Sequence, residues 1–89
     1  MTVLIDGSAV ESREALHDTL ARQLSLPEYY GRNLDALYDC LTDVREDTEL
    51  CLVRFPALCE HLGLYANVLR DVLEDACGEN PHLRLISED

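Results

Sequence analysis

Three short apolar runs alternate along the chain with longer stretches in which apolar residues recur at helical spacing. The first run, Thr2 to Asp6, is rich in β-forming residues and is closed by Gly7, so it predicts a strand. The second run covers Leu50 to Phe55 and the third covers Leu83 to Ser87, and both have the length of a strand. Because helical segments separate the runs, the pattern predicts a parallel sheet with right-handed crossover connections.

The segment between the first two runs carries the start and stop signals of two helices. Ser12 can cap a first helix whose apolar positions recur as far as Leu24, and Leu26-Pro27 would end it. Asn33 can cap a second helix, which we expect to begin at Leu34 and to run to about Thr42.

The segment after the second run is helical in pattern and is interrupted once. Pro56 suits the first turn of a helix, and apolar residues recur at helical spacing from 57 to about 77. Gly63 interrupts the pattern, so we expect a short helix followed by a longer one that Gly78 and Pro81 stop. Three strands bury little surface by themselves, so helices must cover at least one face of the sheet. The expected fold class is therefore a two-layer α/β domain with about four helices.

Length and charge narrow the classes of function. Eighty-nine residues with 47 % apolar side chains predict one domain, residues 1–89, that folds without a cofactor. Eighteen acidic residues against seven basic ones, all Arg, give a formal net charge of −11. Such a field disfavours direct binding of nucleic acid or anionic lipid and favours steering of a basic protein partner. Solubility alone would explain the same charge.

Neither a membrane segment nor a secretion signal is visible in the sequence. No stretch approaches the roughly 20 apolar residues that cross a bilayer, and the start lacks a basic region, so we expect a cytoplasmic protein. The cysteines contain no CxxC pair, which disfavours zinc and redox chemistry. In a reducing compartment we expect core thiols, at Cys40, Cys51, Cys59 and Cys77.

The predicted helix from 34 to 42 separates an apolar face from an acidic one. Asp35, Asp39 and Asp43 recur at i, i+4 and i+8 and share a face with Thr42, while Tyr38 lies at its edge. Like charges at this spacing destabilise a helix by a few tenths of a kcal/mol per pair, and no Lys or Arg in the helix offsets them. These residues alone leave two interpretations open, a functional surface and a solvated charge stripe.

Two tyrosines precede this helix. Tyr29 and Tyr30 are two of the five aromatic residues in the chain. Exposed Tyr beside carboxylates is typical of a protein-binding surface, whereas Tyr is also a common core residue. We therefore expect one of the pair to be buried and the other to be presented to a partner.

The segment from Leu26 to Thr42, Leu-Pro-Glu-Tyr-Tyr-Gly-Arg-Asn-Leu-Asp-Ala-Leu-Tyr-Asp-Cys-Leu-Thr, closely resembles the segment that defines the barstar family. A weaker resemblance extends over the whole chain. It implies a three-stranded parallel sheet in the order 1-2-3. It also implies an intracellular inhibitor, of the antitoxin or immunity type, that binds an extracellular or toxin-type ribonuclease one to one. In that family the loop and helix matching residues 27–43 plug the active site of the enzyme.

Carried over by position, the resemblance implies a role for individual residues. Asp39 would take the place of a substrate phosphate and pair with Arg and His residues of the enzyme. Tyr29 would lie against the catalytic His, and Asp35 would meet a basic residue at the rim of the site. Thr42 would add a polar contact, and Asn33 would shape the loop and the helix.

Further positions bear on the identity of the partner. Asp75 and Glu79, on the last predicted helix, fall where the family places further carboxylates facing the enzyme. Tyr38 and Val44 stand where the best-known family member carries Trp, and Asp43 stands where Gly is usual. Because these positions border the contact face, the resemblance implies a cognate ribonuclease other than the best-known one.

Two other classes of function are compatible with the same residues. A metal-dependent enzyme would use Asp35, Asp39 and Asp43 with His61 as ligands of Mg²⁺ or Ca²⁺, but no EF-hand or glycine-rich phosphate loop accompanies them. An acidic binding module for a basic partner that is not a nuclease would carry the same surface. An inhibitor blocks RNA cleavage, whereas a module binds without blocking it. We expect no catalytic residue, no metal ligand and no cofactor.

Overall fold

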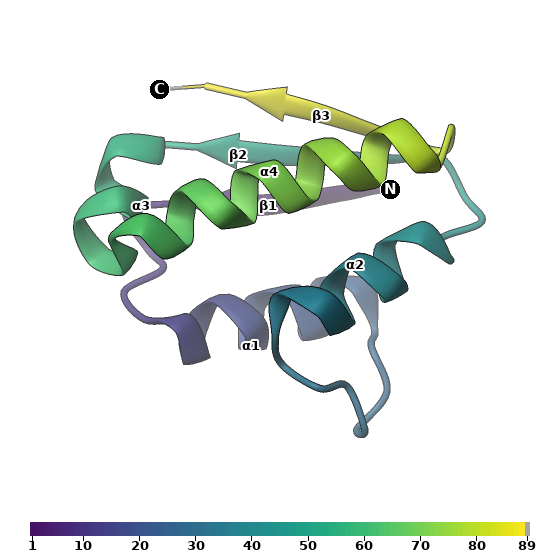
Figure 1. Cartoon of the computed structure of the whole chain (residues 1–89), viewed down its shortest axis with the longest axis horizontal. Coiled ribbons are helices and arrows are strands. Elements are labelled where there is room, and N and C mark those ends of the chain that lie inside the picture. The colour runs from purple at the N-terminus through teal and green to yellow at the C-terminus, as the bar shows by residue number, and fades with distance from the viewer. Residues whose placement is uncertain (89) are drawn as a thin grey trace.

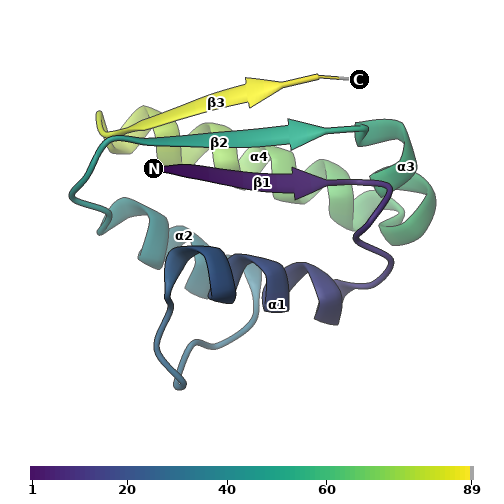
Figure 2. The ribbon, with the colours of Figure 1, turned by 180° about the vertical axis from the view of Figure 1, so that it is seen from behind.

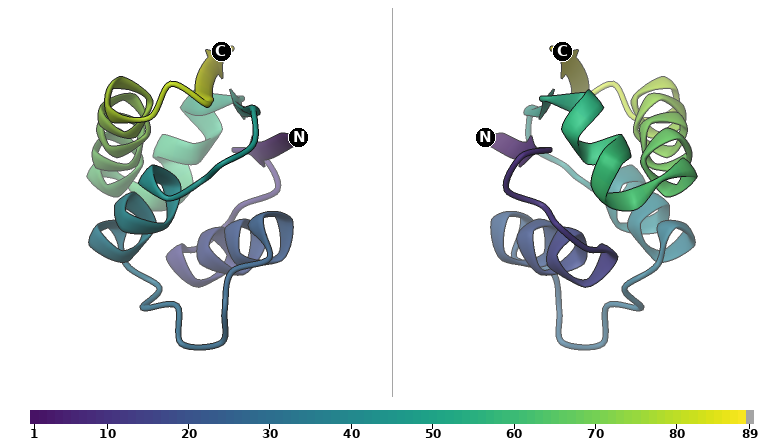
Figure 3. Two further views of the ribbon diagram at one scale, coloured as in Figure 1. Left: turned by 90° about the vertical axis from the view of Figure 1, so that its right-hand side faces the viewer. Right: turned by 90° about the vertical axis from the view of Figure 1, so that its left-hand side faces the viewer.

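In the computed structural model, which describes residues 1–88, a sheet of three parallel strands carries four helices on one of its faces (Figure 1). The strands β1 (Thr2–Asp6), β2 (Thr48–Val53) and β3 (Leu83–Ser87) lie in the order β1-β2-β3. Figure 2 shows the sheet from its open side, and Figure 3 shows the helices gathered on the other side. The predicted α/β class, the parallel pairing and the strand order are confirmed.

The helices are α1 (Arg13–Leu24), α2 (Leu34–Thr42), α3 (Phe55–Leu62) and α4 (Leu64–Glu79). The two predicted caps are present, because Ser12 Oγ accepts from the Ala15 N–H at 3.0 Å and Asn33 Oδ1 accepts from the Ala36 N–H at 2.8 Å. Each bond satisfies one of the amide groups that a helix leaves unpaired at its start.

Two element boundaries differ from the prediction. The second strand covers Thr48–Val53 instead of residues 50–55, because Arg54 takes a left-handed φ of 53° and Phe55 begins α3. An apolar run does not reveal where a buried strand gives way to a buried helix, and Phe55 continues the run from the helix. The predicted stop at Gly78 is also wrong, since α4 continues through Gly78 to Glu79, and Asn80 is its C-cap.

The core lies between the sheet and the helices. Alternate strand residues such as Val3, Ile5, Leu50 and Leu52 are fully buried, so their neighbours point to the open face of the sheet. Gly7 lets the chain leave β1 against α3, because a Cβ there would lie 2.1 Å from the carbonyl oxygen of Arg54. None of the helices formed by residues 1–88 is long and apolar enough to span a bilayer.

The expectation that the cysteines are core thiols is confirmed for Cys40, Cys59 and Cys77, which pack against the core, and is wrong for Cys51. All four are free and half-buried. Cys51 belongs to the open face, because its strand neighbours are the ones that face the helices. Burial raises the pKa of the thiols of Cys40 and Cys77, which keeps both protonated and unreactive near neutral pH.

Candidate partner-binding surface

The loop between α1 and α2 buries one tyrosine and presents the next. The ring of Tyr30 is 7 % exposed, and its hydroxyl lies 2.7 Å from Nδ1 of His17 in α1. Tyr29 is 89 % exposed. The Tyr30 N–H donates to the carbonyl of Pro27 at 2.9 Å, which closes a turn beneath Tyr29. The expected division of the pair is confirmed, and the presented side chain is Tyr29.

His17 ties this loop to two helices. Its side chain is 2 % exposed, and Nε2 lies 2.8 Å from the hydroxyl of Tyr65 in α4. A neutral imidazole has one donor and one acceptor, so it can accept from one of the two tyrosines and donate to the other. Burial is the main cause that lowers the pKa of His17, and burial raises the pKa of Tyr30 to about 12. Both effects favour the neutral, hydrogen-bonded network.

The end of the loop is fixed by Arg32 and Asn33. Arg32 has a left-handed φ of 55°, and its guanidinium donates to the carbonyl of Glu14 at 3.2 Å and pairs with the carboxylate of Asp18. Asn33 caps α2 and also donates through Nδ2 to the carbonyl of Gly31 at 3.2 Å. A loop held in this way loses little conformational entropy when it binds a partner.

The face of α2 that points away from the core is acidic. Leu37 and Leu41 are fully buried, whereas Asp35, Asp39 and Asp43 are exposed. Among residues 1–88 none of these three carboxylates takes part in an ion pair. Thr42 is half-buried, and its hydroxyl already donates to the carbonyl of Asp39 at 3.0 Å. The helix therefore presents three carboxylates without a neutralising group.

Carboxylates of both α2 and α4 act electrostatically on Tyr38. Burial raises the pKa of the Tyr38 phenol, and the carboxylates of Glu79, Asp75 and Asp39 raise it further. The phenol of Tyr38, on α2, is thus close enough to Asp75 and Glu79 of α4 for their charges to act on it, in agreement with the packing of α2 against α4. We call the group Asp39, Asp43, Asp75 and Glu79, with Tyr38 among them, the acidic surface.

The structure does not assemble the metal site considered from the sequence. His61 in α3 donates from Nδ1 to the carbonyls of Gly7 and Val10, each at 3.0 Å, and so lies apart from the aspartates of α2. Within residues 1–88 no group of three His, Cys, Asp or Glu side chains is placed to hold a metal ion. The carboxylates of the acidic surface are instead available to cations of a partner.

Sequence reasoning missed the importance of His17 and Asn80. His17 is one of three histidines that are scattered along the chain and form no motif. Asn80 stands near a predicted helix end, and no other pattern in the sequence singles it out. Both are buried polar residues with their hydrogen-bond partners on other elements. Such partners are distant in the sequence, so no local pattern reveals them.

The position of Asp43 predicts a cost in stability. Its carboxylate lies at the C-cap of α2, near the negative end of the helix dipole and four residues after Asp39. We expect Asp43→Asn to raise the free energy of unfolding by about 0.3 to 1 kcal/mol in urea denaturation. Asp35→Asn is the matched control, because Asp35 lies in the first turn and its charge stabilises the helix. Equal shifts in the two variants would contradict this assignment.

Comparison with known proteins finds a matching family and a similar protein of Bacillus subtilis. A family model described as "Barstar (barnase inhibitor)" matches residues 1–85. A protein of Bacillus subtilis (strain 168) named "Putative ribonuclease inhibitor YrdF" is 45 % identical to this chain over 75 residues, which cover 83 % of this chain and 82 % of that protein. The family match includes the loop, α2 and the whole acidic surface.

Proposed function

This chain belongs to the barstar family, and from this premise we propose that it is an intracellular inhibitor of a ribonuclease, whose active site it covers with residues 27–43. The observation that carries the proposal is the exposed, unneutralised carboxylate of Asp39 at the centre of α2, beside the fixed loop that presents Tyr29. The role is that of a ligand for an enzyme and requires no catalytic residue in this chain.

Asp39 supplies the chemistry of inhibition. A ribonuclease holds the phosphate of RNA with cationic side chains, and a carboxylate in that place accepts the same charge-assisted hydrogen bonds. Water and RNA are then excluded from the active site. Tyr29 adds an aromatic ring that packs against the catalytic His, and Asp35 pairs with a basic residue at the rim. Thr42 contributes a carbonyl or hydroxyl oxygen, since its hydroxyl proton is already donated.

Asp75 and Glu79 extend the contact to α4. Their charges and that of Asp39 all act on Tyr38, and α2 packs against α4, which supports one continuous contact surface over both helices. Tyr38 and Asp43 lie within this surface and depart from the best-known member of the family, so the cognate ribonuclease carries a rim that is matched to them. We propose a one-to-one complex with a basic enzyme of the secreted or toxin type.

The alternative is an acidic module that binds a basic protein other than a nuclease. The two functions are separated by capturing the partner from the source organism and assaying RNA cleavage with the wild-type protein and with Asp39→Ala. We expect a nuclease whose activity disappears at one equivalent of wild-type protein. Recovery of no nuclease, or equal inhibition by both proteins, would refute the proposal.

The net charge of −11 predicts that association depends strongly on salt. Raising the NaCl concentration from about 0.05 to about 0.5 M should lower the association rate constant with the captured nuclease by about tenfold or more, because screening removes the steering field. Stopped-flow fluorescence measures this rate. The double variant Asp75→Asn, Glu79→Gln should show a shallower dependence, whereas Glu60→Gln on α3 should not. A rate independent of salt would mean that the charge serves solubility.

A further inference from the structure

We propose that Asn80 is a positioning residue that holds α2 and α4 in one register, so that the carboxylates of both helices engage the ribonuclease together. This inference rests on the proposed function. The inference goes beyond the proposed function because it gives a role to a buried residue that does not touch the partner. This residue sets how the carboxylates of α2 and those of α4 are placed relative to each other.

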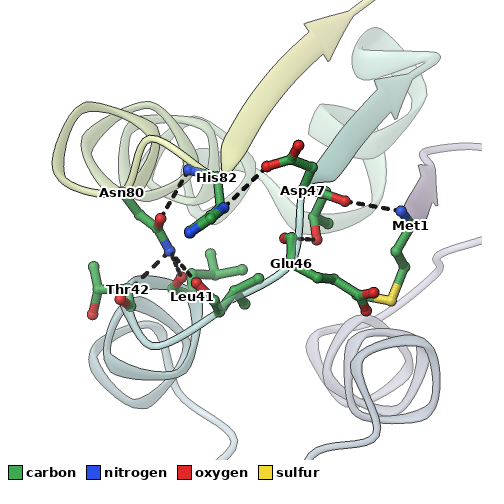
Figure 4. Close-up of polar contacts among 9 residues, drawn as sticks. Met1, Leu41, Thr42, Glu46, Asp47, Asn80 and His82 are labelled. Carbon is green, nitrogen blue, oxygen red and sulfur yellow. Dashed lines mark hydrogen bonds and ion pairs between the residues drawn. The ribbon is translucent and has the colours of Figure 1, made fainter.

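Asn80 connects the ends of the two helices. It follows the last residue of α4, is 5 % exposed and points toward the end of α2 (Figure 4). Its side-chain NH₂ group donates to the carbonyls of Leu41 and Val44, each at 2.9 Å, with the carbonyl of Thr42 at 3.4 Å. Its Oδ1 accepts from the backbone N–H of His82 at 3.0 Å. Every polar atom of the side chain is therefore engaged.

These bonds meet a specific need of α2. The last carbonyls of a helix have no partner within it, and a basic side chain in the last turn often satisfies them. The last turn of α2 has no basic residue, and Asp43 adds a negative charge there. The carbonyl of Leu41 also accepts from the Val44 N–H at 3.2 Å, so the amide of Asn80 gives it a second donor and adds donors for the carbonyls of Thr42 and Val44. It does so without adding a charge, so it can be buried at low cost between the two helices.

The hydrogen bonds of Asn80 fix the position of α2 along α4, which apolar packing leaves free. The packing of α2 on α4 is largely apolar, and apolar contacts are non-directional, so packed helices can slide past each other by small shear movements. The three carbonyls near Asn80 flank Asp43, and Asn80 is covalently attached to Glu79. Any sliding that changes the distance between these two carboxylates must therefore stretch the hydrogen bonds of Asn80.

The segment that follows α2 is restrained from the same side. His82, next to the Asn80 turn, places Nδ1 3.0 Å from the carboxylate of Asp47 (Figure 4). The carbonyl of His82 accepts from the Thr48 N–H at 2.8 Å. The Thr48 hydroxyl donates to the carbonyl of Glu46 at 2.9 Å. The connection from α2 to β2 is thus held at several points, and the buried side chain of Asn80 holds its beginning.

The first test compares Asn80→Ala and Asn80→Asp with a matched control. Asn80→Asp keeps the size and the acceptor of the side chain but removes its donors. The control position is Asn67 on α4, which is half-buried and makes no side-chain hydrogen bond within residues 1–88. We expect Asn80→Ala to raise the Kd for the captured nuclease by about tenfold under conditions in which circular dichroism shows it folded. Asn67→Ala should leave the Kd within about twofold. If Asn80→Asp does not fold, Asn80→Ala alone carries the comparison.

The second test separates positioning from general stabilisation. In the background Glu79→Ala, the rise in Kd caused by Asn80→Ala should fall below about threefold, because α4 then lacks one of the carboxylates that the correct register brings to the enzyme. A cost that is the same in both backgrounds would overturn the proposal. Asp39→Ala is measured in the same series. If inhibition by Asp39→Ala is unchanged, the proposed function is refuted. If Asp39→Ala loses inhibition as expected but the effects of Asn80→Ala and Glu79→Ala are not coupled, only the role of Asn80 is refuted.

A third measurement needs no partner. Backbone residual dipolar couplings report the angle between α2 and α4 in solution. We expect this angle to change, or to become averaged, in Asn80→Ala and to stay as in the wild type in Asn67→Ala. Couplings that remain unchanged in a folded Asn80→Ala protein would show that apolar packing alone sets the register, which would overturn the proposal.

Discussion

Replacing Asp39 with Ala should weaken inhibition of the ribonuclease more than any other single substitution in this chain, by about 3 to 5 kcal/mol, or roughly 100- to 5000-fold in Kd. The reason is that Asp39 is exposed in the middle of α2, between Asp35 and Asp43 along the helix, where the proposed partner would exclude water. Loss of its carboxylate leaves the opposing cationic groups of the enzyme buried without a counterion, and that penalty adds to the loss of attraction.

Stability measurements distinguish this effect from unfolding. In the free protein Asp39 is exposed and lies four residues from both Asp35 and Asp43, so Asp39→Ala removes like-charge repulsion. The free energy of unfolding in urea should therefore stay constant or rise while the Kd increases. Glu60→Ala, at the exposed surface of α3, is the control and should change neither quantity. A larger rise in Kd for Asp35→Ala or Glu79→Ala would contradict the central role of Asp39.

The free energy of unfolding should decrease as the pH is lowered below about 6.5, by at most about 1.4 kcal/mol per pH unit. Burial is the main cause that lowers the pKa of His17 in the folded protein; Arg32 lowers it further, and Asp18 acts in the opposite direction. Below the ordinary His pKa the unfolded chain binds a proton that the folded chain does not. The contribution of this site is therefore complete above about pH 6.5 and is lost as the pH falls toward the lower folded pKa.

Urea denaturation between pH 8 and pH 5 measures this dependence. His17→Phe removes the titrating group and should flatten the curve in this window, even though it lowers the absolute stability by leaving the hydroxyls of Tyr30 and Tyr65 without their partner. His82→Phe is the control, because His82 is exposed and should leave most of the slope in place. An identical slope in the wild type and His17→Phe would show that other groups cause the pH dependence.

The two halves of the site have opposite energetic characters. The loop is stabilised by buried or paired polar groups, namely Tyr30 with His17 and Arg32 with Asp18. The acidic surface gathers like charges that have no ion-pair partner among residues 1–88. A rigid loop lowers the entropic cost of binding, and cations of a partner would supply the counter-charges of the carboxylates. Both effects favour the complex over the free inhibitor.

Much of the fold could be predicted from local patterns. The caps at Ser12 and Asn33 and the spacing of apolar residues located α1 and α2, because these signals act within a few residues. The acidic face of α2 was also predicted, since the positions of Asp35, Asp39 and Asp43 on one face follow from helix geometry alone. The boundary at Phe55 failed because an apolar side chain is buried equally well by a strand and by a helix.

The sequence by itself determined which residues share a face of each element, whereas the tertiary structure decided which faces meet. The tertiary structure buries Tyr30 and exposes Tyr29, because only in the folded chain does His17 reach the hydroxyl of Tyr30. The fold packs α2 against α4, which lets the charges of Asp75 and Glu79 act on Tyr38, and it sets the amide of Asn80 against the end of α2. These contacts join residues that are far apart in the sequence. Periodicity describes a residue relative to its own helix axis and contains no information on how two axes pack.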